Sequence, residues 1–260
     1  MKALLLVCCA LLFSACQSGP SIDRSVVSVN QDSRVQYVVL HYTSTDLAHS
    51  LALLTQGEVS SHYLIAAQPA TIYQLVDEQR RAWHAGESQW RGRTWLNASS
   101  IGIELENQGY TDTPNGRVWQ PYNEAQIDAL IVLLKDIVQR HQLPLGSIIG
   151  HSDIAPQRKL DPGPLFPWQR LAQAGLIEWP DPVAVAQQQI NFSRELPAPA
   201  WFVSQLRLQG YAVPATEVWD KPLLNVLAAF QMKYRPARFD GVADAETAAL
   251  LQVLNSAASA

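Results

Sequence analysis

Apolar residues in the first two thirds of the chain follow two spacings, which predicts strands interleaved with helices. "VQYVVLHYT" (35–43) is rich in β-branched and aromatic residues and predicts a buried strand, and "SHYLIA", "TIYQLV" and "SIIG" predict three shorter ones. "DLAHSLALLTQ" and residues 123–141 carry apolar positions at helical spacing, the latter with Asn123 and Gln126 as a capping pair. Strands alternating with helices predict a mixed α/β domain, a central sheet flanked by helices, over residues 35–180.

The segment "SSIGIELENQG" (99–109) alternates with a period of two, as a strand does. One face carries Ile101, Ile103 and Leu105, and the other carries Gly102, Glu104 and Glu106. We therefore expect one face of this strand in the core and the other to present acid.

The pattern changes after residue 180. Residues 181–198 are predicted to be a linker. Residues 199–257 then hold three short apolar segments at helical spacing and no clear strand: "AWFVSQLRLQGY", "LLNVLAAFQMKYRP" and "AETAALLQVL". This pattern predicts a second, small three-helix domain.

The N-terminus has the layout of a cleaved export signal: a lysine, a short apolar run and small residues before Cys16. The run is too short to span a membrane. It resembles a bacterial lipoprotein signal over residues 1–15, with Cys16 bearing the lipid and 16–34 as a tether, although Phe13 stands where that pattern prefers leucine. By the same resemblance, Gln17 favours the periplasmic face of the outer membrane of a Gram-negative bacterium. Ordinary secretion with cleavage near Cys16 is the alternative.

Cysteine usage and charge narrow the possible chemistry. The chain has three cysteines, all in this N-terminal segment, so the folded part offers no thiol to a disulfide or a metal. Any metal must be bound by His, Asp or Glu. A net charge of -4 without a basic block argues against nucleic acid as a partner.

Two histidines stand at predicted strand ends: His41, and His151 at the start of "HSDIAPQRKLDPGP" (151–164), a segment too proline-rich for a helix or a strand. Two imidazoles and a nearby aspartate form the ligand set of an open, catalytic zinc site. Spacing leaves open whether Asp153 or Asp161 completes it. His49 and His141, on predicted helices among polar neighbours, are expected to be solvated and are given no role.

The alternative with Asp153 has different chemistry. A His-x-Asp pair with a distant histidine is also how facial-triad oxygenases bind iron. With Asp161 instead, the prolines would stiffen the loop and return the carboxylate to the metal. Export away from cytosolic cosubstrates makes the iron oxygenase less attractive.

Five motifs in series, "VVLHYT", "SSHYLI", "WHAG", "SIGIELEN" and "GHSDIAPQRKLDPGPLFPW", resemble the type-2 zinc-dependent N-acetylmuramoyl-L-alanine amidases, close to the AmiD-like outer-membrane lipoproteins. That family is related in fold to the peptidoglycan-recognition proteins. The resemblance covers about residues 35–180. The C-terminal "FQ" and "FDGVADAET" resemble the small three-helix peptidoglycan-binding domain.

The resemblance also implies roles for single residues. It implies three zinc ligands: His41, His151 and Asp161. It implies that Glu104 is the acidic catalytic residue and Lys159 the cation beside the metal, and it places His84 and Arg158 by the substrate. His62 would be structural, and Asp153, which matches no ligand, would cap the loop through local hydrogen bonds.

These residue types suit amide hydrolysis, and the resemblance implies cleavage between N-acetylmuramic acid and the L-alanine of the stem peptide in peptidoglycan and muropeptides. Zinc lowers the pKa of its bound water to roughly 7. Glu104 can move a proton from water to the leaving amine, and Lys159 can stabilise the oxyanion by on the order of 3 kcal/mol. A second hypothesis is a peptidoglycan-binding module without activity, although no matched ligand is missing.

Overall fold

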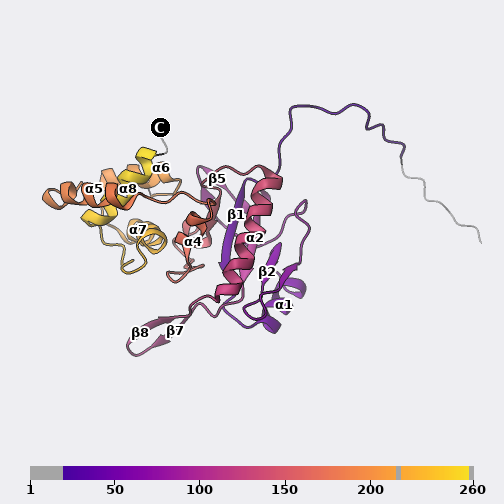
Figure 1. Ribbon diagram of the computed structural model, residues 1–260, viewed down its shortest axis with the longest axis horizontal. Helices are drawn as coiled ribbons and strands as arrows, with labels where there is room; N and C mark the ends of the chain where they lie inside the picture. The colour runs from indigo at the N-terminus through magenta and orange to yellow at the C-terminus, as the bar shows by residue number, and fades with distance from the viewer. Residues whose placement is uncertain (1–19, 215–217, 258–260) are drawn as a thin grey trace, which may run out of the picture. The chain divides into compact units, whose positions relative to one another are not determined.

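The computed structural model describes residues 20–214 and 218–257. The chain divides into two compact units, Met1–Asp32 and Ser33–Ala260. Residues 20–32 are exposed and form no helix or strand, whereas the second unit carries every described element (Figure 1). The predicted signal peptide and Cys16 lie outside the described residues.

A five-stranded sheet organises the second unit. Its order is β3-β2-β6-β1-β9; β3 is antiparallel to β2, and the other pairs are parallel. The strands are β1 (Tyr37–Tyr42), β2 (Tyr63–Ile65), β3 (Ile72–Gln74), β6 (Ser100–Leu105) and β9 (Ile148–Gly150). The four parallel strands therefore end at one edge, where α/β sheets usually bind their ligands.

Two small hairpins and a series of helices surround this sheet. The hairpins are β4 (Gln89–Trp90) with β5 (Arg93–Thr94), and β7 (Tyr110–Thr113) with β8 (Gly116–Trp119). The helices are α1 (Leu47–Gln56), the 3-10 helix η1 (Leu96–Ala98), α2 (Glu124–His141), α3 (His151–Ile154), α4 (Trp168–Gln173), α5 (Pro182–Arg194), α6 (Pro199–Gln209), α7 (Lys221–Tyr234) and α8 (Ala245–Ala257). The mixed α/β fold with added helices confirms the predicted class. No helix among the described residues is long and apolar enough to cross a membrane.

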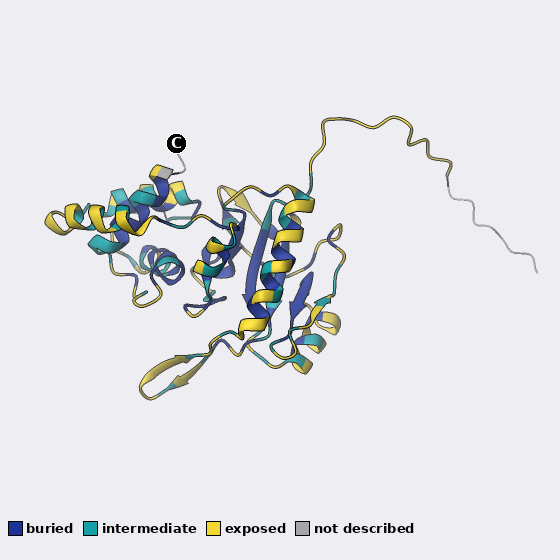
Figure 2. Cartoon of the chain, in the orientation of Figure 1, coloured by how far each residue is buried: buried dark blue, intermediate teal, exposed yellow. Residues whose placement is uncertain are grey.

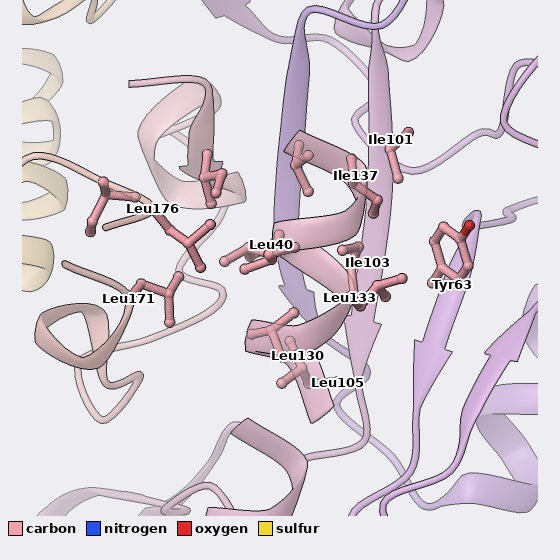
Figure 3. Close-up of a cluster of buried hydrophobic side chains, with 14 of the residues drawn as sticks. Leu40, Tyr63, Ile101, Ile103, Leu105, Leu130, Leu133, Ile137, Leu171 and Leu176 are labelled. Atoms are coloured by element: carbon pink, nitrogen blue, oxygen red, sulfur yellow. The ribbon is translucent and has the colours of Figure 1, made fainter. Parts of the chain in front are cut away.

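Helix α2 covers one face of the sheet. The predicted alternation in β6 is confirmed: its isoleucines and Leu105 pack with Leu130, Leu133 and Ile137 of α2 (Figure 3). The outward face of α2 is exposed (Figure 2). Each fully buried aliphatic side chain stabilises the fold by about 1.5–3 kcal/mol, so this layer fixes which face of the sheet remains for the site.

The start of α2 differs from the predicted capping pair. Asn123 does cap the helix, because its side chain accepts from the Ala125 amide at 2.9 Å. Gln126 is buried, and its Nε2 donates to the carbonyls of Ile65 at 2.9 Å and Glu106 at 3.1 Å. Gln126 therefore ties α2 to the ends of β2 and β6 instead of capping the helix, because its side chain faces the sheet.

The C-terminal helices cover the opposite face. Val39 of β1 and Ile149 of β9 share one apolar cluster with Phe202, Leu227 and Phe230 of α6 and α7. The three predicted helices of this region are confirmed as α6, α7 and α8. The core of these helices includes residues of the sheet, so the helices form a second layer on it. The predicted boundary between two domains at residues 181–198 stays a prediction.

The segment that the sequence predicts as a linker contains helix α5. Asp181 accepts a hydrogen bond from the Ala184 amide at 2.8 Å, and Pro182 occupies the first turn, where its missing N–H is not needed. No residue of α5 is buried, which is why its apolar pattern is weak. The helix nevertheless packs along α8 (Figure 1).

A buried carboxylate joins strand β2 to helix α2. Glu78 accepts from Tyr63 Oη at 2.6 Å, from His141 Nε2 at 2.8 Å and from Arg140. Burial alone would raise the pKa of Glu78, but these donors outweigh it and lower the pKa to about 2.

The prediction that His141 is solvated is wrong, because its side chain is only 7 % exposed. The same prediction for His49 is confirmed, with 75 % of its side chain exposed.

Replacing Glu78 with glutamine should destabilise the protein by on the order of 2 kcal/mol at pH 7, because charged hydrogen bonds are lost. A depressed pKa gives stability that is present above the ordinary value of 4.5 and is lost as pH falls through about 2. The difference between wild type and Glu78→Gln should therefore shrink in denaturant titrations run toward pH 3. Glu58→Gln, at an exposed position, is the control, and a difference independent of pH would contradict the assignment.

Candidate metal centre

Three strand ends deliver the candidate residues to one edge of the sheet. His41 lies in β1 directly opposite Glu104 of the neighbouring parallel strand β6. On the other side of β1, β9 ends at Gly150 and the next residue is His151. The sequence alone leaves strand direction open, and the parallel pairing explains why residues so far apart in the chain meet here.

The segment after β9 folds back on itself. Its first four residues form the one-turn helix α3, so the prediction that this segment is too irregular for a helix is wrong at its start. Further on, Lys159 N donates to Ala155 O at 3.0 Å and Ser152 N donates to Asp161 O at 2.8 Å. These bonds close the loop and bring the Asp161 side chain beside His151.

His41, His151 and Asp161 form a compact, buried cluster. The two Nδ1 atoms lie 2.9 Å apart, and each lies 2.9 Å from Asp161 Oδ2. Burial, followed by the neighbouring His151, lowers the pKa of His41 to about 4. Burial opposes ionisation of Asp161, yet the two histidines hold its pKa well below the ordinary value. The cluster thus offers imidazole nitrogens and a carboxylate oxygen at a single point.

A chain of hydrogen bonds behind His41 assigns its tautomer. Ser100 Oγ donates its only hydrogen to the Leu96 carbonyl at 2.7 Å, so it must accept from His84 Nε2 at 3.2 Å. Burial and nearby His41 keep the pKa of His84 well below its ordinary value, so His84 is neutral and its Nδ1 carries no hydrogen. This nitrogen therefore accepts from His41 Nε2 at 3.1 Å, which leaves His41 Nδ1 unprotonated.

His151 is held in the same way from another side. Its Nε2 faces the Ala85 carbonyl at 3.1 Å and can only donate to it, the Arg158 guanidinium lies 3.4 Å from the same nitrogen, and Nδ1 faces the cluster. Two imidazole nitrogens and one carboxylate oxygen thus face a single point, which is a set of donor atoms that suits a cation. Zinc ligands lie about 2.0–2.2 Å from the ion, which this spacing permits. The residues present therefore fit a divalent metal.

Gly102 gives His84 its place. A β-carbon at Gly102 would lie 2.4 Å from the His84 ring, so only glycine lets the imidazole lie against β6. His62 accepts from the Gly102 amide through Nδ1 at 3.0 Å and faces Arg80 O through Nε2 at 3.1 Å. His62 is buried and holds backbone segments together, as the structural role predicted for it requires.

Glu104 faces a cavity of about 190 Å³ that also contains the metal cluster, His84 and Lys159. Its Oε2 is buried and accepts no hydrogen bond within the described part of the chain. Burial, followed by repulsion from Asp161, raises the pKa of Glu104 to about 8, although the charge of Lys159 opposes the shift. A carboxyl group with a pKa this close to neutrality can both take and give a proton.

Glu106 has a different task. Its two carboxylate oxygens accept from the backbone amides of Leu47 at 3.0 Å and Ala67 at 2.7 Å. It therefore anchors the start of α1 and the end of β2. The sequence alone separates Glu104 from Glu106 only through the family resemblance, whereas their hydrogen bonds separate them directly.

Asp153 points away from the cluster, toward the C-terminal helices. Its oxygens accept from Gly150 N at 2.9 Å, from Tyr211 Oη at 2.7 Å and from Lys233 Nζ at 3.0 Å. The predicted local cap is confirmed by the bond from Gly150. The facial triad with iron is wrong, because helix α3 turns Asp153 away from His151 and all its neighbours are donors.

Arg158 is held by the protein itself. Its guanidinium donates to the Ala85 carbonyl and, from Nη2, to the Glu87 carbonyl at 2.6 Å. These bonds hold the backbone at Ala85 and Glu87, and the Ala85 carbonyl is the group that faces His151 Nε2. They leave Arg158 as part of the wall of the site, and a role in substrate binding stays a prediction.

Two features of this region escape the sequence reading. Trp83 of the "WHAG" motif is 51 % exposed on the rim of the metal cavity, with Arg81 lying 4.0 Å above its ring. Its place in the "WHAG" motif could have identified Trp83 from the sequence.

Lys233 of α7 is buried, and its Nζ lies 4.3 Å from the centre of the Trp168 ring. Its pairing with Asp153 crosses 80 residues, so no local pattern could reveal it.

Removing the Lys233 ammonium should destabilise the protein by about 3–5 kcal/mol, because the buried Asp153 carboxylate is left without its counter-ion. Chemical denaturation of Lys233→Met tests this, with Lys221→Met on the exposed start of α7 as control. The double variant with Asp153→Asn should recover part of the loss. Equal stability of Lys233→Met and wild type would contradict the structural role of the pair.

Loss of His84 should weaken metal binding, because His41 then loses the acceptor that fixes its tautomer. Such partners behind a ligand typically contribute 10–100-fold to affinity. Competition with a chromophoric chelator should show a drop of this size for His84→Phe. The exposed histidine variant His49→Phe should bind like wild type. Unchanged affinity in His84→Phe would refute the tautomer assignment.

Comparison with known proteins agrees with this geometry. The sequence model of the N-acetylmuramoyl-L-alanine amidase family matches residues 31–164. The chain is 43% identical to the N-acetylmuramoyl-L-alanine amidase AmiD of Escherichia coli, covering 96% of this chain and 95% of that protein. It is also 43% identical to 1,6-anhydro-N-acetylmuramyl-L-alanine amidase AmpD of Escherichia coli, over 43% of this chain and 56% of AmpD.

Two solved structures extend the likeness to most of the chain. Escherichia coli AmiD, in complex with the substrate anhydro-N-acetylmuramic acid-L-Ala-D-gamma-Glu-L-Lys, superposes with a TM-score of 0.84 at 42% identity, covering 92% of this chain and 95% of that one. AmpDh3 of Pseudomonas aeruginosa gives 0.86 at 41% identity, covering 93% of this chain and 100% of that one. The chain therefore belongs to the N-acetylmuramoyl-L-alanine amidase family.

Proposed function

We propose that this protein is a zinc-dependent amidase that hydrolyses the amide between N-acetylmuramic acid and the L-alanine of the stem peptide. The observation that carries the proposal is the cluster of His41, His151 and Asp161 beside the unpartnered oxygen of Glu104. Membership of the amidase family and the activity of the similar AmiD and AmpD proteins support the same bond and the same substrate class. The family is generally zinc-dependent, which favours zinc as the metal.

In this proposal, His41 and His151 bind zinc through Nδ1 and Asp161 binds it through its carboxylate. Two nitrogens and one oxygen are a donor set that zinc uses in catalytic sites, where one position stays open. When bound, zinc polarises the substrate carbonyl and makes water a better nucleophile at neutral pH.

Glu104 is proposed to be the general base and acid. It takes a proton from the attacking water and passes it to the nitrogen of the departing L-alanine, so that the C–N bond can break. Its raised pKa of about 8 supports both steps, because neither protonation state is strongly disfavoured near neutrality. Its free oxygen supports the same role, since no protein donor competes for it among the described residues.

Lys159 is proposed to stabilise the oxyanion. It lines the metal cavity together with Glu104, and it is half-buried, so its charge acts in a medium less polar than water. A single well-placed donor of this kind contributes on the order of 3 kcal/mol to transition-state stabilisation.

The surroundings of the catalytic unit are also part of the proposal. Cys16 would carry a lipid that anchors the protein to the periplasmic face of the outer membrane, with residues 16–34 as a tether, of which residues 20–32 are exposed. This rests on the layout of the N-terminal segment.

The C-terminal helices are proposed to be a peptidoglycan-binding-like domain. The two motifs that suggest it are joined in space: Gln231 of "FQ" donates to Val242 O at 2.9 Å and accepts from the Gly241 amide at 2.8 Å in "FDGV".

Glu104→Gln should lower turnover by about 10²–10⁴-fold, because the proton transfer is lost while the metal ligands remain. Mass spectrometry of purified muropeptides would follow release of the peptide from the sugar, and metal analysis would show one zinc per chain in both proteins. Asp161→Asn should instead lose the metal, and a chelator should abolish wild-type activity until zinc is returned. Full turnover by Glu104→Gln would refute its assigned role.

A further inference from the structure

A second cavity, of about 320 Å³, lies next to the metal site and is used by none of the chemistry above. Its walls come from hairpin β4–β5, from the segment after α3 and from Ala212 near the C-terminal helices. Arg158 lines both this cavity and a hollow of about 470 Å³ that contains Lys159 and Asp161. Arg158 therefore belongs to the lining of both spaces, and one of them also contains the candidate ligand Asp161.

Trp95 distinguishes this cavity. The indole is 62 % exposed although tryptophan is the largest apolar side chain. Its backbone lies in the left-handed region at φ 54° and ψ 57°, a conformation that costs a residue with a β-carbon about 1–2 kcal/mol. A hydrogen bond from Trp95 N to Ser88 O at 3.0 Å fixes the backbone there. Exposed aromatic area on a strained, anchored backbone is a feature typical of binding sites.

The facing wall is formed by the loop that carries the metal ligands. Ile154, Ala155 and Pro156 supply apolar surface, and Gln89, Thr94 and Glu87 add uncharged and acidic hydrogen-bonding groups. A flat aromatic face with a few polar side chains suits a sugar ring, which is apolar on its C–H face and polar along its hydroxyl rim.

The charges separate a sugar from the stem peptide. The peptide in the AmiD complex, L-Ala-D-gamma-Glu-L-Lys, carries both carboxylate and ammonium groups, whereas an N-acetylated sugar ring is uncharged. Among the described residues that line this cavity, Glu87 and Arg158 are charged, and the Arg158 guanidinium already donates to the Ala85 and Glu87 carbonyls. The other hollow that Arg158 lines contains Lys159 and suits the peptide better.

We propose that the cavity beside Trp95 is a saccharide subsite, which binds the sugar adjacent to the muramic acid of a glycan-bearing substrate. The inference rests on the proposed amidase function and deepens it: the enzyme would distinguish substrates by the length of their glycan. Stacking on Trp95 would place the glycan against the metal loop and so orient the scissile amide.

The test compares two substrates with the same tripeptide: an N-acetylmuramoyl monosaccharide and a tetrasaccharide with sugars on both sides of the muramic acid. Wild type should prefer the tetrasaccharide in kcat/KM. In Trp95→Ala the kcat/KM for the tetrasaccharide should fall about tenfold, mainly through KM, because a stacking anchor is lost. The value for the monosaccharide should not change, which also shows that the variant is folded. Trp95→Phe, with an aromatic face retained, should recover most of the preference.

Ala212→Phe fills the cavity from another lining residue, which is not one of the candidate metal ligands, and it should cause the same selective loss. Equal loss on both substrates, no loss on either, or a wild type indifferent to glycan length would overturn the subsite. If wild type cleaved neither substrate, the proposed function itself would fail, which separates the two failures.

Discussion

The structure depends on one constraint: two imidazole nitrogens and one carboxylate oxygen, all from buried residues, lie 2.9 Å from one another at one edge of the sheet. Ser100 and His84 direct the Nε2 hydrogen of His41 outward, and the Ala85 carbonyl faces Nε2 of His151, so that both Nδ1 atoms face the cluster. A divalent cation among the three atoms would be bound by all of them. The protein itself arranges these atoms, which favours tight binding of a metal and leaves little to reorganise during catalysis.

Two layers hold the loop that carries this arrangement. On one side it continues from β9, and on the other Asp153 pairs with Lys233 of α7 in the interior of the protein. The C-terminal helices thus contribute to the amidase fold itself, because they share a core with the sheet and carry the counter-ion of Asp153, two positions from the candidate ligand His151. This contact links the stability of the helical layer to the position of His151.

The local sequence pattern predicts much of the fold and of the candidate site. Periodicity in β6 and α2 identifies the core face and the acidic face, and the motif series identifies the family and the residues that converge. Three things lie beyond it. The parallel direction of β1 and β6, which makes Glu104 a neighbour of His41, depends on the assembled sheet. The helix in the supposed linker has no buried face to give a pattern. The partners of Asp153 and Glu78 come from distant segments, so spacing cannot reveal them.

The most direct test of the metal centre is diffraction from crystals of the zinc-loaded protein, recorded on both sides of the zinc absorption edge. The account predicts one anomalous peak within about 2.0–2.2 Å of Nδ1 of His41, Nδ1 of His151 and the carboxylate of Asp161. His84 should remain behind His41, and Asp153 should remain with Lys233. An anomalous peak at bonding distance from Nε2 of either histidine, or from Asp153 in place of Asp161, would contradict the proposed metal centre.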